Sequence, residues 1–210
     1  MIRRGRSTKY PATPGSAGSD TDALQSTTVL REISAEGWWE NEWRTLPSKR
    51  SRVSSIAEVR FNLQVAAEPG ELAALLSKSG WQQVPDTDWR WVLQALNPEA
   101  SSVTLPLLGR AYQGAPEDLM LKKMIGKQEL VTLRLWDSGV RLAPDGSVLY
   151  LGQLVEEVLV QRFGLFSFWR AVAVREAMFV SLQQALSALE QKNAEDDLIL
   201  LRQIESPPLF

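Results

Sequence analysis

The 210-residue sequence contains no histidine and no cysteine. Without these side chains the chain cannot form a zinc site of the usual kind, a disulfide, a cysteine nucleophile or a Ser-His dyad. Most hydrolase mechanisms are therefore excluded, and we expect no catalytic residues, no metal and no cofactor. The lack of cysteine fits the cytoplasm and an oxidising compartment equally well, so it does not determine the location.

Long uncharged apolar runs are also absent. The most apolar long segment, 163–186, carries Arg170, Arg175 and Glu176, which favours a buried helix of a soluble domain over a membrane span. The arginine-rich start is followed by polar residues, so no signal peptide is predicted. A net charge of −2 gives no support for nucleic-acid binding through overall positive charge, and we expect no nucleic-acid partner.

Composition divides the chain into three parts. Residues 1–28 are rich in Pro, Gly, Ser and Asp and are predicted to be a disordered tail. Residues 29–58 form a tryptophan-rich and basic lead segment. Residues 59–205 contain the readable strand and helix patterns, and we assign them to a single domain.

The most regular stretch runs from 119 to 160 and predicts an antiparallel meander of three strands. Val131, Leu133 and Leu135 fall on one face of the middle strand, while Leu130, Thr132, Arg134 and Trp136 fall on the other, so one buried face is implied. The segment 125–128 suits a hairpin loop, and Pro144-Asp145-Gly146 is a strong turn signal. Residues 137–139 predict a bulge or bend.

Around this meander the sequence predicts two main helices. One begins at Pro69 and stops at Gly80, and the other begins at Phe168 and continues to about Lys192. A helix over 86–96 and strands over Val59–Val65 and Leu198–Ile204 are also expected. The resulting fold class is α+β, with an antiparallel sheet of about five strands covered chiefly on one face by the two main helices.

Two sets of residues are candidates for contacts with other molecules. In the lead segment, membrane or partner contact and packing on the chain's own domain stay open for Trp38, Trp39, Trp43, Lys49, Arg50 and Arg52. Basic residues of the meander could bind an anion such as a phosphate head group, or could pair with Asp118, Glu129, Asp137, Glu156 or Glu157. The candidate ligand-binding residues are Lys122, Lys123, Lys127, Arg134, Arg141, Arg110 and Tyr112.

Three segments carry a resemblance to a known family. FNLQVAAEPGELAALLSKSGW, LPLLGRAYQGAPEDLMLKK and LVTLRLWDSGVRLAPDGSVLYLG occur in the order and spacing of the LssY-like C-terminal domain. The upstream GWWENEWRTLPSKR is similar to the segment that leads into that domain. The resemblance covers roughly residues 37–200.

The resemblance implies an accessory domain of bacterial inner-membrane proteins that carry a DedA-like region, a type 2 phosphatidic acid phosphatase (PAP2) region, or both. Such a protein, fused or separate, is the partner that it implies, together with anionic lipid. It also implies a cytoplasmic chain at the inner membrane, with the periplasmic face left open. The phosphatase chemistry needs histidines, which this chain lacks. The polar start leaves open whether the chain is a fragment or a free-standing relative.

Three functions stay open on this basis. The first is a non-catalytic module that senses anionic lipid or a protein partner. The second is an enzyme that acts on a phosphorylated lipid or a saccharide with carboxylate, lysine and arginine chemistry. The third is an assembly domain, and the sequence does not determine the oligomeric state.

Overall fold

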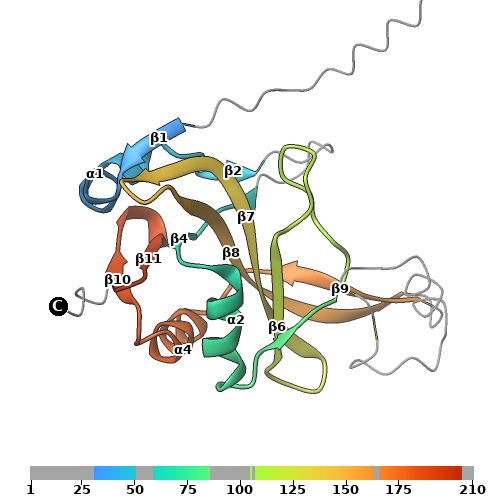
Figure 1. Ribbon diagram of the computed structural model, residues 1–210. Coiled ribbons are helices and arrows are strands. Elements are labelled where there is room, and N and C mark those ends of the chain that lie inside the picture. Colours follow the sequence, from blue (N-terminus) through green and yellow to red (C-terminus); the bar gives the residue numbers. More distant parts are fainter. Residues whose placement is uncertain (1–30, 51–58, 86–104, 106, 163–165, 205–210) are drawn as a thin grey trace, which may run out of the picture.

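The computed structural model describes residues 31–50, 59–85, 105, 107–162 and 166–204 (Figure 1). Its centre is the predicted meander of β6 (Leu119–Met124), β7 (Glu129–Ala143) and β8 (Ser147–Arg162). Both strand pairs are antiparallel. The expected bulge is confirmed, because the register of β7 and β8 shifts between Asp137 and Val140 and Gly139 has a φ of 76°.

The predicted α+β fold with an antiparallel five-stranded sheet is wrong. The described residues form a mostly β structure with a mixed nine-stranded sheet in the order β10-β11-β4-β8-β7-β6-β5, with β1 beside β7 and β9 beside β8. The pairs β1–β7 and β11–β4 are parallel. Alternation in a sequence identifies a strand but not its neighbour or direction. The remaining strands of this sheet are β1 (Arg31–Ser34), β4 (Leu63–Ala66), β5 (Gln82–Gln83), β9 (Phe166–Val172), β10 (Glu190–Asn193) and β11 (Ile199–Arg202).

Two helices cover one face of this sheet. In α2 (Pro69–Ser77), Leu72 and Leu76 are buried, and in α4 (Glu176–Ala185), Leu182 is buried. They pack on a core that includes Val131, Leu133 and Leu135 of β7. The predicted end of α2 is confirmed: Gly80 has a φ of 84°, and the Trp81 N–H donates to the carbonyl of Leu76.

The helix predicted from Phe168 to about Lys192 is wrong at both ends. Residues 166–172 form β9, which pairs with the second half of β8, beyond the residues that pair with β4. The helix ends at Ala185, although Leu186 and Leu189 still reach the same core from the turn that follows. The helical spacing of apolar residues therefore continues beyond the end of α4. Residues Glu190–Asn193 form β10 and pair with β11.

The sequence predicts one buried face of β7, but both faces are buried. On the second face, Thr132, Arg134 and Trp136 are buried as well. The lead segment covers part of this second face with α1 (Ala35–Glu40) and the 3-10 helix η1 (Glu42–Thr45), as Figure 1 shows near β1. Ser34 caps α1, since its hydroxyl accepts from the Gly37 N–H.

The expected strand over Val59–Val65 is interrupted. Its start, β3 (Val59–Arg60), pairs with β2 (Lys49–Arg50) in a separate two-stranded ladder, while Leu63–Ala66 lies between β8 and β11. The predicted tail 1–28 and the predicted helix 86–96 lie outside the described residues. In the described ranges, every helix is too short or too polar to cross a bilayer.

Close strand packing at Gly152 predicts a clear stability effect. A Cβ at this position would lie 2.7 Å from the Leu63 Cβ and 2.9 Å from a Leu135 methyl group. We expect Gly152→Ala to lower the free energy of unfolding by about 1–3 kcal/mol, measured by urea denaturation. The control is Gly70→Ala in α2, where nothing lies within 4 Å. It should be neutral or stabilise by up to about 1 kcal/mol. Equal effects of the two variants would contradict the packing.

Candidate functional site

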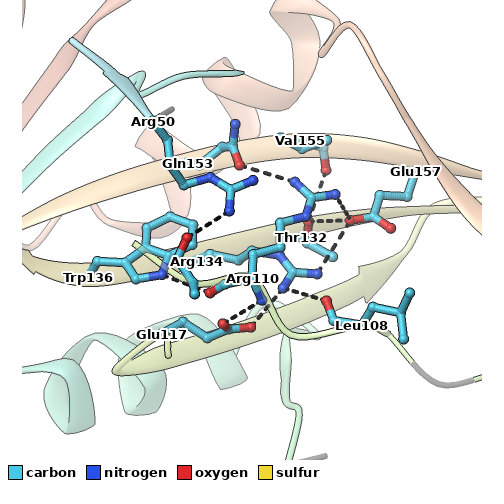
Figure 2. Close-up of polar contacts among 11 residues, drawn as sticks. Arg50, Leu108, Arg110, Glu117, Thr132, Arg134, Trp136, Gln153, Val155 and Glu157 are labelled. Atoms are coloured by element: carbon cyan, nitrogen blue, oxygen red, sulfur yellow. Dashed lines mark hydrogen bonds and ion pairs between the residues drawn. The ribbon is translucent and has the colours of Figure 1, made fainter. Parts of the chain in front are cut away.

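A group of charged side chains is buried on the second face of the sheet, beneath the loop 107–118 (Figure 2). Its centre is Arg134 of β7, whose side chain is 1% exposed. Arg134 lies on this face because it alternates with Leu133 and Leu135, which face the helices. Its partner in the register of β8 is Gln153, which is buried beside it.

Two glutamates compensate the arginines of this network. Glu117 accepts from Arg134 Nη1 at 2.7 Å with one oxygen and from the Arg110 N–H at 2.8 Å with the other. Glu157 Oε1 accepts from Arg110 Nη2 at 3.1 Å and from the Thr132 hydroxyl at 3.2 Å. The same oxygen lies 3.5 Å from Arg134 Nη2.

Side chains of the sheet and of the lead segment also hold the loop backbone. Arg134 Nη1 donates to the Leu108 carbonyl and the Trp136 indole donates to the Arg110 carbonyl, both at 3.0 Å. Arg50 donates to the Ala111 carbonyl at 3.0 Å. The loop is therefore attached along its length, while its Leu108 side chain stays 67% exposed.

The Arg134 guanidinium keeps its charge at neutral pH. Burial and the nearby charge of Arg110 lower the pKa of Arg134 to about 10, while Glu157 and Glu117 act in the opposite direction. The positive charges of Arg110 and Arg134 are matched by the negative charges of Glu117 and Glu157. Folded proteins tolerate buried ions when they are paired in this way.

The structure brings Arg110 and Arg134 together, as two of the predicted ligand residues. Lys122 of β6 lies directly opposite Thr132 of β7. Thr132 and Arg134 are two positions apart on β7, so Lys122 lies on the same face of the sheet as Arg134. A carboxylate of the chain, rather than an added anion, lies against Arg134. Lys122 and Lys123 are half-buried on β6, and Lys127 is exposed in the loop that follows.

The other two predicted ligand residues lie apart from this network. Arg141 makes two hydrogen bonds with the Asp137 carboxylate, at 2.9 and 2.8 Å, across the bulge. Tyr112 is buried and packs edge-on against Phe61 at a centroid distance of 5.3 Å. Burial raises the pKa of Tyr112.

Most lead-segment candidates face the protein interior. Trp38 and Trp43 are buried, and Gln64 connects them by accepting from the Trp38 indole at 2.8 Å and donating to the Trp43 carbonyl at 3.0 Å. Trp39 is half-buried, with the Arg202 guanidinium 4.5 Å from its ring centroid. Arg50 is buried, Lys49 is exposed, and Arg52 lies outside the described residues.

Sequence analysis missed Glu117, Gln153 and Thr132, and it named Glu157 only as an alternative partner. A glutamate and a glutamine inside the apolar run of β8 are the signals that point to a buried polar network. Glu117 gives no such signal, because it lies in a loop. Among the described residues, no cluster of acidic side chains could hold a metal ion.

Removal of the central cation predicts a large loss of stability. Arg134→Met leaves Glu117 buried without its ion-pair partner and removes one of the two arginines beside Glu157. We therefore expect the free energy of unfolding to fall by about 3–5 kcal/mol. Lys122→Met, on the same face and half-buried, is the control and should change stability by less than about 0.5 kcal/mol. Chemical denaturation measures both. A loss below about 1 kcal/mol for Arg134→Met would contradict the network.

The bulge predicts a pH effect. Hydrogen bonds from Arg141 lower the pKa of Asp137 below its ordinary value of 3.8. The pair therefore stabilises the fold above that value, and this contribution is lost as pH falls through the folded pKa. Because Asp137 is 39% exposed, we expect about 0.5–1 kcal/mol. Asp137→Asn should narrow the stability difference between neutral and strongly acidic pH by this amount, and an unchanged pH profile would contradict the role of the pair.

Comparison with known proteins gives one match. The family model described as LssY C-terminus matches residues 29–172, which covers the lead segment and the strands β1 to β9 but not α4, β10 and β11. The matched range starts earlier and ends earlier than the expected 37–200. No curated protein and no solved structure matches the chain. Since the model matches more than half of the sequence, this chain belongs to the LssY C-terminus family.

Proposed function

We propose that this domain is a non-catalytic binding module that contacts anionic lipid at the bacterial inner membrane, beside a lipid-phosphatase or DedA-type membrane protein. The observation that carries the proposal is that buried charges are used internally. Glu117, Glu156 and Glu157 are less than a tenth exposed, and each accepts at least two hydrogen bonds from the chain. A general base or nucleophile must instead be available to a substrate.

The loop 107–118 supports a binding role. Charged and aromatic side chains of the sheet hold its backbone, whereas Leu108, Ala111 and Ala115 are exposed on its outer side. Loops on a rigid scaffold are common binding elements. A pre-ordered loop also loses less conformational entropy when a partner binds.

The lead segment supports contact with anionic lipid. Its buried tryptophans fix it to the domain, and its last part and the strand paired with it expose Arg44, Lys49 and Arg60. Each basic residue near an anionic membrane surface contributes about 1 kcal/mol. The resemblance implies membrane-embedded regions on the N-terminal side of this domain, which is the side of the lead segment.

The two alternatives have less support. An assembly domain would use exposed Trp38, Trp39 and Trp43 at the contact, but Trp38 and Trp43 are buried. An enzyme would need a desolvated carboxylate beside Arg134 that is available to substrate. Glu117 and Glu157 are desolvated and lie beside Arg134, but they are occupied by hydrogen bonds within the chain.

Vesicle co-sedimentation tests the proposal. The protein should bind vesicles that contain phosphatidylglycerol or phosphatidate, should not bind pure phosphatidylcholine, and should release as salt is added, because salt screens exposed charges. Lys49→Glu should weaken binding at least about fivefold. The control is Lys78→Glu, at the exposed C-terminal end of α2. Equal sedimentation with neutral and anionic vesicles, or equal effects of the two variants, would contradict the proposal.

A further inference from the structure

Strand β9 forms one edge of the main sheet (Figure 1). All seven of its residues pair with β8, and the register does not shift along the ladder. In the described ranges, residues 167–172 have no hydrogen bond or ion pair other than those of this ladder. The other side of β9 is therefore open to a further strand.

The pattern of the ladder shows which backbone groups point to the open side. The Leu159 N–H donates to the Gln128 carbonyl, so Leu159 faces the β7 side of β8. Backbone groups of successive residues point to opposite sides of a strand, so the two neighbours of Leu159 face β9. Their partners on β9 are Phe168 and Arg170, which are therefore bonded to β8. The residues that direct their N–H and C=O groups to the open side are Ser167, Trp169 and Ala171.

The other edge strands of the sheet are shorter and more polar. β5 has the sequence QQ, β10 has EQKN and β1 has REIS. Short length and charged side chains are common protections of a sheet edge against another chain. β9 has seven residues with the sequence FSFWRAV, which contains one charge and no proline. Among the edges that the structure describes, β9 is thus the long and mainly apolar one.

The side chains of β9 also leave room for a neighbour. Phe168 is 41% exposed and Arg170 is exposed, and both point to the same face of the sheet. Trp169 points to the other face and is half-buried. It packs against the cluster of Leu107, Met120 and Leu130. An exposed aromatic ring and an exposed cation therefore lie two positions apart on an edge whose middle residue is held by the core.

This edge is complementary to a second copy of itself. When two copies pair antiparallel with Trp169 opposite Trp169, Ser167 of each copy lies opposite Ala171 of the other. All three outward residues then exchange backbone hydrogen bonds across the contact. In the same register Phe168 of each copy lies opposite Arg170 of the other, and an aromatic ring attracts a guanidinium.

Other registers fit less well. A two-fold axis at Arg170 places the two arginines directly opposite each other, where like charges repel. An axis at Phe168 leaves the outward groups of Ala171 without a strand partner. The register centred on Trp169 therefore satisfies both the backbone and the side chains.

We propose that the open edge of β9 pairs with β9 of a second copy of this chain, in an antiparallel dimer whose two-fold axis passes beside Trp169. The contact is separate from the lipid contact of the proposed function and does not involve the tryptophans of the lead segment. Seven residues a side is fewer than the roughly 20–30 of a stable interface, so the dimer is weak and depends on protein concentration.

Sedimentation equilibrium between about 10 μM and about 1 mM protein tests the dimer. The weight-average mass should rise with concentration from 23.5 kDa toward twice this value. Because a two-fold contact is closed, the mass should not rise further. A mass that stays at 23.5 kDa over this range overturns the self-pairing and leaves the edge to an extended segment of a different protein. A mass that rises beyond the dimer overturns the closed contact.

Variants at exposed positions test the register. Phe168→Arg places like charges opposite each other twice in each dimer, so the dissociation constant should rise at least about tenfold. The double variant Phe168→Arg, Arg170→Glu places opposite charges there and should restore the dimer. The control is Val180→Arg in α4, where the side chain is 45% exposed, and it should leave the dissociation constant unchanged. Equal dissociation constants for Phe168→Arg and Val180→Arg would overturn the contact.

Hydrogen exchange of individual amides locates the contact on the strand. The amides of Phe168 and Arg170 should be protected at every concentration, because they are bonded to β8. Those of Trp169 and Ala171 should exchange rapidly in dilute protein and several-fold more slowly at concentrations at which the dimer forms. A dimer that forms without this slowing would use another surface and would overturn the proposal.

Discussion

The buried guanidinium of Arg134 is the constraint on which the second face of the sheet depends. A charge that has lost its hydration is tolerated only when it is paired and hydrogen-bonded. Here one carboxylate comes from the loop 107–118 and the other from β8, while the loop also supplies the Leu108 carbonyl. Loop and sheet therefore supply each other's hydrogen-bond and ion-pair partners.

Neutral polar side chains elsewhere on the sheet are also hydrogen-bonded within the chain. Gln64 connects the lead segment to β4 through Trp38 and Trp43. Asn62 both accepts from the Leu154 N–H and donates to its carbonyl, so its amide continues the ladder along β8 between β4 and β9. Polar groups inside the sheet thus serve the architecture.

Local patterns predicted the meander, its bulge and α2 because alternation, turn residues and the glycine stop act over a few positions. Strand order and direction depend on distant segments, and so the parallel pairs were missed. The helix predicted from Phe168 to about Lys192 covered residues of β9 and β10. At its C-terminal end the apolar spacing continues through Leu186 and Leu189 after α4 ends. In the site, Arg110 and Arg134 stood out as charges beside strands. Their partner Glu117 lies 17 positions from Arg134 and becomes visible only once the loop is placed on the sheet.

Native-state hydrogen exchange of the loop amides tests the central claim most directly. The Arg110 N–H is bonded to Glu117 and the Asp118 N–H to the Leu135 carbonyl. If the buried charges fix the loop to the sheet, both amides open with the same free energy as amides in the middle of β7, at the level of global unfolding. Exchange of these two amides at nearly the rate of an unstructured peptide, with β7 still protected, would contradict the account.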